Sequence, residues 1–434
     1  VNGDGLEDFF VGGASRQNGC FYIQQKSGNF KSQVLTQTSK LQEDLASVLV
    51  DTDKDGDLDL IVSGGSTEYP RGFQSSVQLF LNDGEGNFQQ NLMAIPAQLQ
   101  TFCTTLAVAD VDHDGDQDIF VGGRLDAEHF PQLPQSYLLI NQNGFFKEQT
   151  AQLAPDLLYA GMITGAVWTD YNHDNQIDLV IVGEWASVQF FKNQHGKLSL
   201  DTQTSELTHR KGMWRSIIAK DLDADGDQDL VIGNWGLNQK YHISEARPYH
   251  LYAKDIDNNG TNELLPAYFL KNKTGEFELY PDLDRNQFAE QTPTIKKKFL
   301  LHRDFAETTM DELIKNIGNE SLVDLSCDYG QSVWLENQAG KFVTHDLPIE
   351  AQMAPINAIE VTDVNADGML DLILAGNEFQ TEITTGRIDA SYGLILLGTK
   401  QKRFIPQSIG YQGLFFRGDT KAMQLIHGAQ KSYL

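Results

Sequence analysis

The chain alternates short apolar runs with clusters of acidic residues, and this alternation predicts a fold made of short β-strands. In the stretch 51–65, the acidic cluster DTDKDGDLD is followed at once by the apolar run LIVSGG. Apolar runs of this length, bounded by turn-forming residues, are typical of buried strands. The carboxylates of the cluster repel one another unless a positive charge lies among them. The cluster therefore predicts a positively charged group or ion close to these carboxylates.

The acidic cluster occurs seven times with one spacing, D-x-[DN]-x-[DN]-[GN]-x-x-[DE]. The copies read DTDKDGDLD, DVDHDGDQD, DYNHDNQID, DLDADGDQD, DIDNNGTNE and DVNADGMLD, and VNGDGLED, which lacks the first acidic residue, opens the chain. Each full copy follows an apolar segment such as TLAVAD, and most precede a second one that ends near glycine, such as DIFVGG. A hairpin pattern, an apolar run followed by N-x-x-G-x-[FL], comes further on. One unit is therefore strand, acidic loop, strand, variable loop, strand, hairpin turn and strand.

Units of this kind predict an all-β fold, a seven-bladed β-propeller that spans residues 1–434 as one domain. The copies at Asp51, Asp110, Asp170 and Asp221 begin about 50 to 60 residues apart, which suits four short antiparallel strands per blade. The C-terminal segment DTKAMQLIH is a candidate for the inner strand that is missing before Val1. Such a strand would close the ring and remove its exposed sheet edges. Eight blades or an incomplete fragment are the alternatives.

The stretch between Asp221 and Asp363 breaks the regular spacing. The copy at Asp255 begins 34 residues after Asp221, and we expect it to form an extra loop at the third-to-fourth strand turn of the same blade. The segment 269–321 contains the basic run IKKKF and the helix-like pattern DFAETTMDELIKNIG, and it is predicted to be a partly helical insertion within the propeller. LVDLSCD and SVWLENQAGKF are then expected to be the later strands of a blade that lacks an acidic loop.

The acidic loops have the composition of calcium sites. Oxygen ligands at positions 1, 3, 5 and 9, with a backbone carbonyl at position 7, are typical of calcium. Position 6 is glycine in most copies because the chain turns tightly there, and Asn175, which tolerates left-handed geometry, replaces it once. An EF-hand would need an acid at position 12, where Val62 and Val121 stand. The loops lack cysteine, and His113 and His173 lie between ligand positions, which disfavours zinc and copper.

We therefore predict several calcium ions, one per acidic loop, between the first and second strands of most blades. For a single copy, a solvated acidic turn is the alternative. The predicted ligands of the seven loops are Asn2, Asp4, Leu6 and Asp8; Asp51, Asp53, Asp55, Asp57 and Asp59; Asp110, Asp112, Asp114, Asp116 and Asp118; Asp170, Asn172, Asp174, Gln176 and Asp178; Asp221, Asp223, Asp225, Asp227 and Asp229; Asp255, Asp257, Asn259, Thr261 and Glu263; and Asp363, Asn365, Asp367, Met369 and Asp371.

Composition narrows the classes of partner. Acidic residues outnumber basic residues by 60 to 33, a formal net charge of -27, and this disfavours nucleic acid. The three cysteines form no CxxC pair, so at most one disulfide is expected, with buried free thiols as the favoured state. No run approaches the about 18 apolar residues of a transmembrane helix. The chain begins at Val1 inside a repeat, without an initiator Met or a signal peptide, and we expect a piece of a longer chain.

The acidic loops, each followed by a glycine-ended strand, resemble the FG-GAP/VCBS repeats. Those repeats form the calcium-bearing propellers of integrin α-subunits and of many bacterial surface proteins, and the resemblance covers nearly the whole chain except 269–321. VNGDGLEDFFVGGA, GNWGLN and GRIDASYGLILLG are similar to bacterial VCBS proteins that also carry an ASPIC/UnbV module, which is not visible here. The resemblance implies a secreted or outer-surface bacterial protein with an adhesion-like role.

No catalytic motif is present. The chain lacks a G-x-S-x-G elbow, a Walker loop, an HExxH helix and a dinucleotide-binding glycine motif, so no catalytic residue is predicted. Some propellers build active sites from dispersed loops. An enzyme that acts on polysaccharide, in the manner of a lyase, is therefore an alternative, and a structural spacer in a longer surface protein is another.

A ligand face is predicted at the end of the blades opposite the acidic loops. The variable loops meet there, and they carry aromatic and planar polar side chains of the types enriched in recognition surfaces. These side chains are Tyr69, Arg71, Arg124, Trp185, Trp235, Arg247, Glu378 and Arg387. Packing of the two tryptophans against neighbouring blades is the alternative. The predicted function is recognition of an extracellular protein or glycan.

Overall fold

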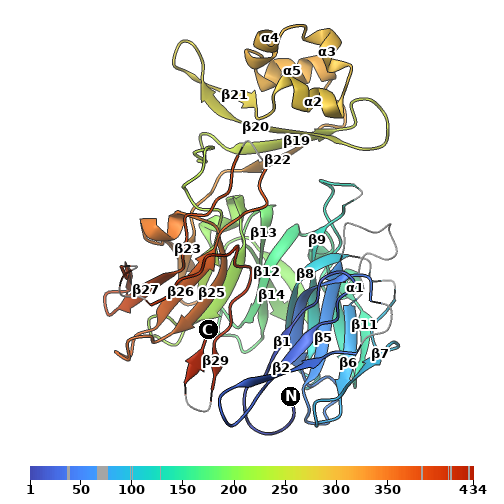
Figure 1. The fold of residues 1–434 in the computed structure, drawn as a ribbon, viewed down its shortest axis with the longest axis vertical. Coiled ribbons are helices and arrows are strands. Elements are labelled where there is room, and N and C mark those ends of the chain that lie inside the picture. The colour runs from blue at the N-terminus through green and yellow to red at the C-terminus, as the bar shows by residue number, and fades with distance from the viewer. Residues whose placement is uncertain are drawn as a thin grey trace.

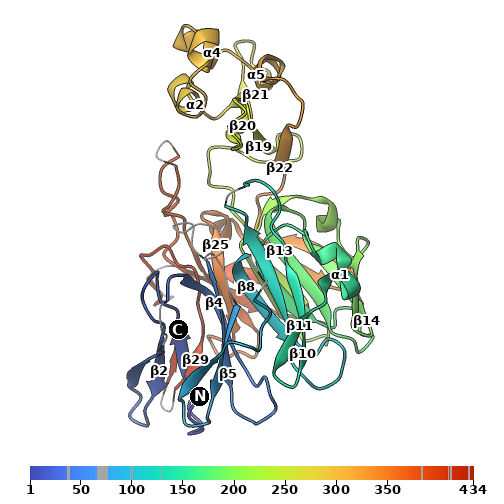
Figure 2. The same ribbon diagram turned by 90° about the vertical axis from the view of Figure 1, so that its right-hand side faces the viewer.

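The structure, a computed structural model, consists mainly of antiparallel β-sheets, which confirms the predicted all-β class (Figure 1). It describes residues 1–36, 40–65, 77–97, 99, 101–127, 129–382, 385–408, 410, 413–428 and 431–434. Six sheets in this part of the chain are built from the repeats. A further sheet, with helices, stands apart from them at one end of the molecule (Figures 1 and 2).

Each repeat sheet is a meander of antiparallel strands that pair with their chain neighbours, apart from one interruption described below. The strands of the six sheets are β1 (Phe9–Val11), β2 (Cys20–Gln24) and β3 (Phe30–Val34); β4 (Glu43–Val50), β5 (Asp59–Gly65), β6 (Val77–Asn82) and β7 (Phe88–Asn91); β8 (Phe102–Ala109), β9 (Asp118–Leu125), β10 (Tyr137–Gln142) and β11 (Phe145–Glu148); β12 (Met162–Thr169), β13 (Asp178–Ala186), β14 (Gln189–Gln194) and β15 (Lys197–Asp201); β17 (Ser216–Lys220), β18 (Asp229–Gly233), β23 (Val333–Asn337) and β24 (Phe342–Asp346); and β25 (Ile356–Thr362), β26 (Asp371–Gly376), β27 (Leu394–Thr399) and β28 (Arg403–Pro406).

Short elements connect these sheets. The two-residue strand β16 pairs with β13, and the remaining connectors described are one helical turn and three 3-10 turns. They are β16 (Gly212–Met213), α1 (Thr150–Leu153), η1 (Pro155–Leu157), η2 (Glu206–His209) and η3 (Ile349–Gln352).

The second strand of a repeat sheet is buried on both faces. In β9, Ile119 packs with Ile61 of the preceding sheet, whereas the next residue, Phe120, packs with Leu179 and Phe191 of the following sheet. Alternate residues of a strand point to opposite faces, so a strand between two neighbours is apolar throughout. This is why these strands follow the acidic loops as continuous apolar runs. The first strands, β4, β8, β12, β17 and β25, lie against one another in succession and stack the sheets side by side.

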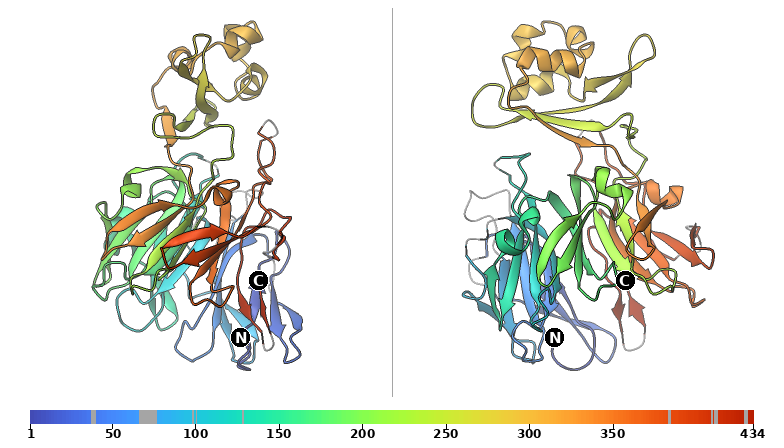
Figure 3. Two further views of the ribbon diagram at one scale, coloured as in Figure 1. Left: turned by 90° about the vertical axis from the view of Figure 1, so that its left-hand side faces the viewer. Right: turned by 180° about the vertical axis from the view of Figure 1, so that it is seen from behind.

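The chain leaves the repeat array after β18 and returns at β23. Between them lies an inserted unit, residues 249–327, whose sheet has the order β21-β20-β19-β22. Figure 3 shows this unit standing clear of the repeat sheets from two sides. Its elements are β19 (Tyr249–Lys254), β20 (Glu263–Lys271), β21 (Phe277–Pro281), α2 (Arg285–Gln291), α3 (Ile295–Lys298), α4 (His302–Ala306), α5 (Met310–Ile317) and β22 (Val323–Cys327).

Two strand assignments made from the sequence are wrong. LVDLSCD contains β22, which pairs with β19 inside the inserted unit, and SVWLENQAGKF contains β23 and β24, which complete the sheet of β17 and β18. The Asp255 loop joins β19 to β20 and does not lie at a third-to-fourth strand turn. The helices expected within 269–321 are present, but strands on both sides of that segment belong to one inserted sheet. The count of seven blades relied on the misassigned strands, and the repeat sheets of the described chain number six.

The C-terminal segment lies between the last and the first repeat sheets. The main-chain N–H of Leu425 donates to Glu360 of β25 (3.2 Å), and that of His427 donates to Glu7, just before β1 (2.6 Å). Strand β29 (Ile426–His427) pairs with β30 (Ser432–Tyr433) and not with β1, so DTKAMQLIH does not supply the predicted inner strand. The segment nevertheless links the two ends of the array through hydrogen bonds.

No helix in the described part of the chain has the length and apolar character needed to cross a bilayer.

Candidate metal centres

Each acidic loop is a tight turn with two residues in the left-handed region. In the Asp51 loop these are Lys54 at position 4 (φ 64°) and Gly56 at position 6 (φ 95°). Position 6 was expected to need this geometry. Position 4 needs it too, as in His113 and His173, but the residue type does not reveal it, because this position holds lysine, histidine, alanine, asparagine or glycine.

The carboxylates at positions 1 and 5 are fixed by main-chain hydrogen bonds. Asp51 accepts the N–H of Gly56 at position 6 (3.1 Å), and Asp55 accepts the N–H of Asp57 at position 7 (2.9 Å). The first of these bonds recurs at 2.8 to 3.1 Å in the loops that begin at Asp110, Asp170, Asp221, Asp255 and Asp363. These hydrogen bonds point the loop's carboxylates inward.

The carboxylate at position 9 joins the loop to the sheet. Asp59 is 1% exposed, accepts the N–H of Thr52 at position 2 (3.1 Å), and accepts the N–H of Asn82 on the third strand (2.9 Å). The same pair of bonds holds three other buried carboxylates, those of Asp118, Asp229 and Asp371. Asp178 differs in that the side-chain amide of Asn172, and not a main-chain N–H, donates at the loop side (2.7 Å). Position 9 thus anchors the loop as well as being a candidate ligand.

Burial raises the pKa of six of the position 9 carboxylates, those of Asp59, Asp118, Asp178, Asp229, Glu263 and Asp371. For Asp118, Asp178 and Asp229 loss of solvation is the main cause, and despite hydrogen bonds that act in the opposite direction the pKa reaches about 7. Repulsion from neighbouring loop carboxylates contributes in the same direction. A nearby cation would remove this penalty, because opposite charge favours the ionised form.

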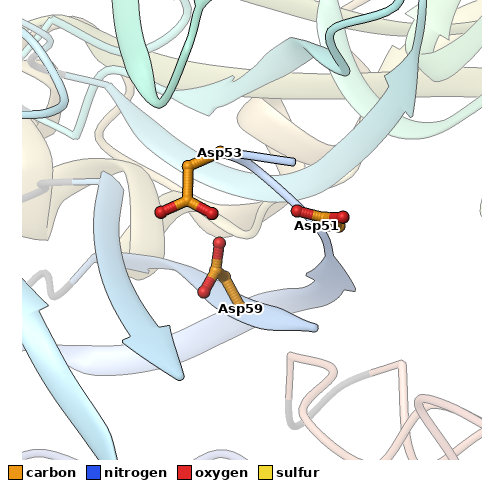
Figure 4. Close-up of side chains that lie close together, drawn as sticks. All are labelled: Asp51, Asp53 and Asp59. Carbon is orange, nitrogen blue, oxygen red and sulfur yellow. The ribbon is translucent and has the colours of Figure 1, made fainter. Parts of the chain in front are cut away.

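Four loops bring three carboxylates together. In the Asp51 loop, oxygens of Asp51, Asp53 and Asp59 lie within 4.8 Å of one another (Figure 4). The other clusters are Asp110, Asp112 and Asp118; Asp221, Asp223 and Asp225; and Asp255, Asp257 and Glu263. In three of these clusters a buried carboxylate oxygen has no hydrogen-bond donor, namely Oδ1 of Asp53, Asp110 and Asp221. Buried, unpartnered anionic oxygens are costly without a counter-charge, and an all-oxygen set of this kind fits a hard cation such as calcium.

The other loops have an amide at position 3. Asn2 and Asn365 donate through their side-chain amides to the position 5 carboxylates of Asp4 (3.2 Å) and Asp367 (3.0 Å). An asparagine side chain also has a carbonyl oxygen that can bind calcium. Binding of the cation through the main-chain carbonyls at position 7 stays a prediction.

The asparagine of the N-x-x-G hairpin pattern contacts the loop of the preceding sheet. The Asn82 amide donates to the carbonyl of Val1 (2.8 Å), and Asn193 donates to the carbonyl of Val111 (2.8 Å). Asn141 and Asn337 make the equivalent bonds to Thr52 and Tyr171. From the sequence, this asparagine was assigned only to a turn. Its regular recurrence at the same place in these repeats was the one sign that it also contacts a neighbouring sheet.

The described residues predicted for a ligand face lie in several different settings. Arg124 and Arg215 both contact Glu184 Oε1 at 2.6 Å, and Arg215 lies 3.7 Å from Glu378. Although burial raises the pKa of Glu184, the two guanidinium groups hold it below its usual value. Arg124 and Glu378 thus belong to one ion-pair network at the end of the sheets from which the inserted unit departs.

The two predicted tryptophans pack at the base of the inserted unit. Trp185 stacks on Tyr249 of β19 with ring centroids 5.4 Å apart, and Trp235 packs on Tyr241 at 5.5 Å. They therefore join the inserted unit to the repeat array. The sequence suggested a ligand face for them, with packing against neighbouring blades as the alternative. Arg247 packs over the Phe277 ring at 4.4 Å. Tyr69 and Arg71 lie outside the described residues.

Arg387 lines a cavity beside this junction. The cavity has a volume of about 360 Å³ and lies between residues 237–242, which lead into the inserted unit, and residues 385–390. Lys240, Tyr241 and His242 line one side, and Thr385 and Asp389 lie with Arg387 on the other. Its volume is within the range of small-molecule sites.

Comparisons with known proteins agree with the repeat pattern. The FG-GAP-like repeat model matches residues 1–62, 65–121 and 170–232. Among solved structures, the chain is similar to the V. cholerae biofilm matrix protein Bap1, with 11% identity, coverage of 93% of this chain and 81% of that chain, and a TM-score of 0.30. It is also similar to the exotype rhamnogalacturonan lyase YesX, with 12% identity, coverage of 92% and 68%, and a TM-score of 0.31.

Both TM-scores are below 0.5, so neither likeness supports an inference about this chain. No curated protein sequence matches it. The repeated acidic loops, the strands that flank them and the three matched segments agree with one another, and the chain contains FG-GAP-like repeats.

Proposed function

We propose that the chain is a calcium-stabilised β-propeller that recognises a protein or glycan outside the cell. The six repeat sheets would be the blades of one domain over residues 1–434. The observation that carries the calcium proposal is the pair of buried carboxylate oxygens without donors in two of the clustered loops, at Asp53 and Asp110. A divalent ion there offsets the repulsion among the carboxylates, and its binding energy adds to the free energy of folding.

The calcium proposal is tested by thermal unfolding of chelator-treated protein with and without millimolar calcium. We expect the Tm to rise in calcium, and the D110N variant, which weakens one cluster, to show a smaller rise. D83N is the matched control, because Asp83 lies in the exposed β6–β7 turn outside the acidic loops. A Tm that is the same with and without calcium would contradict the proposal.

The proposed location is the cell surface or the extracellular medium. Calcium sites of low affinity are filled at the millimolar concentrations found outside cells, and seven acidic loops suit that environment. The large negative net charge is consistent with several bound cations and with a partner other than nucleic acid.

Recognition is proposed at the end of the array that carries the inserted unit. The cavity there combines a tyrosine with side chains of both charge signs, a mixture suited to the hydroxyl groups of a glycan or the polar groups of a protein. A glycan array probed with calcium-loaded protein tests this, and R387A should lose the signal. R303A is the control, because the Arg303 side chain on α4 is 79% exposed and does not line the cavity. Equal loss in both variants would contradict the assignment.

A second candidate is an enzyme that acts on polysaccharide. The observation that favours it is the presence of Lys240, Tyr241 and His242, all capable of proton transfer, on one wall of the cavity. Elimination from an acidic polysaccharide creates a carbon–carbon double bond that absorbs ultraviolet light. Absorbance that grows with wild-type protein and is lost in H242A would favour the enzyme over a binding module. A protein with neither product nor ligand would fit a structural spacer.

A further inference from the structure

The hairpin between the third and fourth strands of a repeat sheet packs on the acidic loop of the preceding sheet. In four hairpins the contact is made by a glycine with φ of +84°, and a Cβ added to it would lie 3.0 to 3.6 Å from the residue at position 3 of that loop. The pairs are Gly86 with Asn2, Gly144 with Asp53, Gly196 with Asp112, and Gly340 with Asn172. The hairpin glycine thus lies directly beside the candidate cation position.

The hairpin between β27 and β28 departs from this pattern. Lys402 stands at the left-handed position (φ 55°), and its N–H closes the turn on the carbonyl of Thr399 (3.0 Å). The hairpin itself is equivalent to the others, because the N–H of Gly398 donates to the position 9 carboxylate of Asp371 (2.8 Å) as that of Asn337 does to Asp229. A lysine therefore replaces the glycine at the point of closest approach to the preceding loop.

The ammonium group of Lys402 lies among the carboxylates of the Asp221 loop. Its Nζ is 2.5 Å from Asp223 Oδ2 at position 3, 3.8 Å from Asp225 Oδ2 at position 5, and 2.6 Å from Glu336 Oε1 on β23. The side chains of Asp223 and Glu336 are 3% and 10% exposed, so these carboxylates are largely removed from water, whereas the Lys402 side chain is 44% exposed. The ring of Phe404 packs edge-on against Trp334 and holds the hairpin in place.

No other lysine of the described chain reaches position 3 of an acidic loop through an ion pair. Lys54 contacts the position 7 side chain of Asp116 (2.9 Å), and Lys192 contacts the position 5 side chain of Asp174 (3.0 Å). These are contacts at the edge of a loop. The contact of Lys402 with Asp223 is at its centre.

We propose that Lys402 is the resident cation of the Asp221 loop and takes the place of calcium there. This inference rests on the calcium function proposed for the other loops. The ammonium is attached to the neighbouring hairpin, so its effective concentration at Asp223 is high, and a calcium ion would have to displace it. The fifth and sixth repeat sheets are then held together by a permanent charge, whereas the other sheets depend on a soluble ion.

The test is the number of calcium ions bound per chain, measured by native mass spectrometry and by calorimetric titration. K402G restores the glycine of the four other hairpins, and we expect it to bind one more ion than the wild type. K341M is the matched control, because Lys341 lies in the preceding hairpin and donates to the carbonyl of Gln203 (2.7 Å), away from any loop carboxylate. It should bind the wild-type number.

Two more variants keep the test decisive if K402G folds poorly. K402M should also gain one ion. D223N should leave the wild-type number unchanged and should remove the additional ion from K402G. The proposal is overturned if neither Lys402 variant gains an ion, or if D223N in the wild-type background loses one. A wild type that binds no calcium would contradict the calcium function of the other loops, whereas an ion gained by K402G would still support the role of Lys402.

Discussion

The side-chain amide of Asn141 donates a 2.8 Å hydrogen bond to the main-chain carbonyl of Thr52, a residue of the preceding acidic loop 89 positions earlier. The Asn141 side-chain oxygen accepts the N–H of Gly144 (2.8 Å), so one buried amide holds its own hairpin and the neighbouring loop together. This contact makes each loop part of an interface between two sheets. Loop order and sheet packing are therefore coupled.

We expect N141A to lower the free energy of unfolding by about 3 kcal/mol, because it leaves the carbonyl of Thr52 and the N–H of Gly144 without their partner. Urea-induced unfolding measures this change. Q142A is the control, since the neighbouring Gln142 is exposed, and its stability should equal that of the wild type. An N141A protein as stable as Q142A would show that the bond between sheets contributes nothing.

The stability of the metal-free protein should fall as the pH rises from about 4 to about 7. Asp118, Asp178 and Asp229 have pKa values of about 7 in the folded protein, above the ordinary value of 3.8 that they regain on unfolding. The folded state thus binds more protons in this range, and the stability that the protonated form provides is lost as the pH passes the folded pKa. The Tm of chelator-treated protein between pH 5 and 8 measures the effect.

Calcium should cancel this loss, because the ion binds the ionised carboxylates. The same series of Tm measurements in calcium should be flat or should rise with pH. A metal-free Tm that increases from pH 5 to pH 7 would contradict the raised pKa values of these aspartates.

The ion-pair network at Glu184 should be sensitive to loss of its central charge. Glu184 is held by Arg124 and Arg215, each 2.6 Å away, and its side chain is 13% exposed. E184Q leaves two guanidinium groups without this carboxylate, and we expect the free energy of unfolding to fall by about 3 kcal/mol. The double variant R124M/E184Q should lose less free energy of unfolding than the two single variants lose together. Additive effects in this double-mutant cycle would argue against coupling between Arg124 and Glu184.

Two of the three cysteines, all of which are free thiols, should be unreactive in the folded protein. Cys103 and Cys327 are 1% and 0% exposed, and burial raises their pKa values to about 11 and about 12. Because the thiolate is the reactive form, iodoacetamide at pH 8 should modify them only after unfolding. Cys20, which is partly exposed, provides the internal comparison by mass spectrometry. Equal rates at all three positions in native protein would contradict this prediction.

The acidic loops could be predicted because their chemistry is local. Within the Asp51 loop, the spacing of the carboxylates and the glycine at position 6 is set by nine consecutive residues, and the hydrogen bond from Gly56 to Asp51 spans only five. The burial of β5 likewise follows from its own apolar run. Such features need no knowledge of which strand lies next to them.

The errors concern strand partners. β23 pairs with β18 across the inserted unit, and Asn337 donates its N–H to Asp229 at a separation of 108 residues. The apolar pattern of β23 would suit any buried strand, so it could not identify its neighbour. Trp185 was predicted to lie on a ligand face, but only the position of Tyr249 shows that it joins the inserted unit to the array.

The sequence by itself determined the all-β class, the repeat and the oxygen-rich loops, because strand periodicity and turn geometry depend on residues close together in the chain. Only the tertiary structure decided which sheets are neighbours, which strands complete the interrupted sheet, and that the ammonium of Lys402 enters the loop of Asp223. These depend on contacts between segments far apart in the sequence, where a side chain's partner is selected by packing and not by spacing.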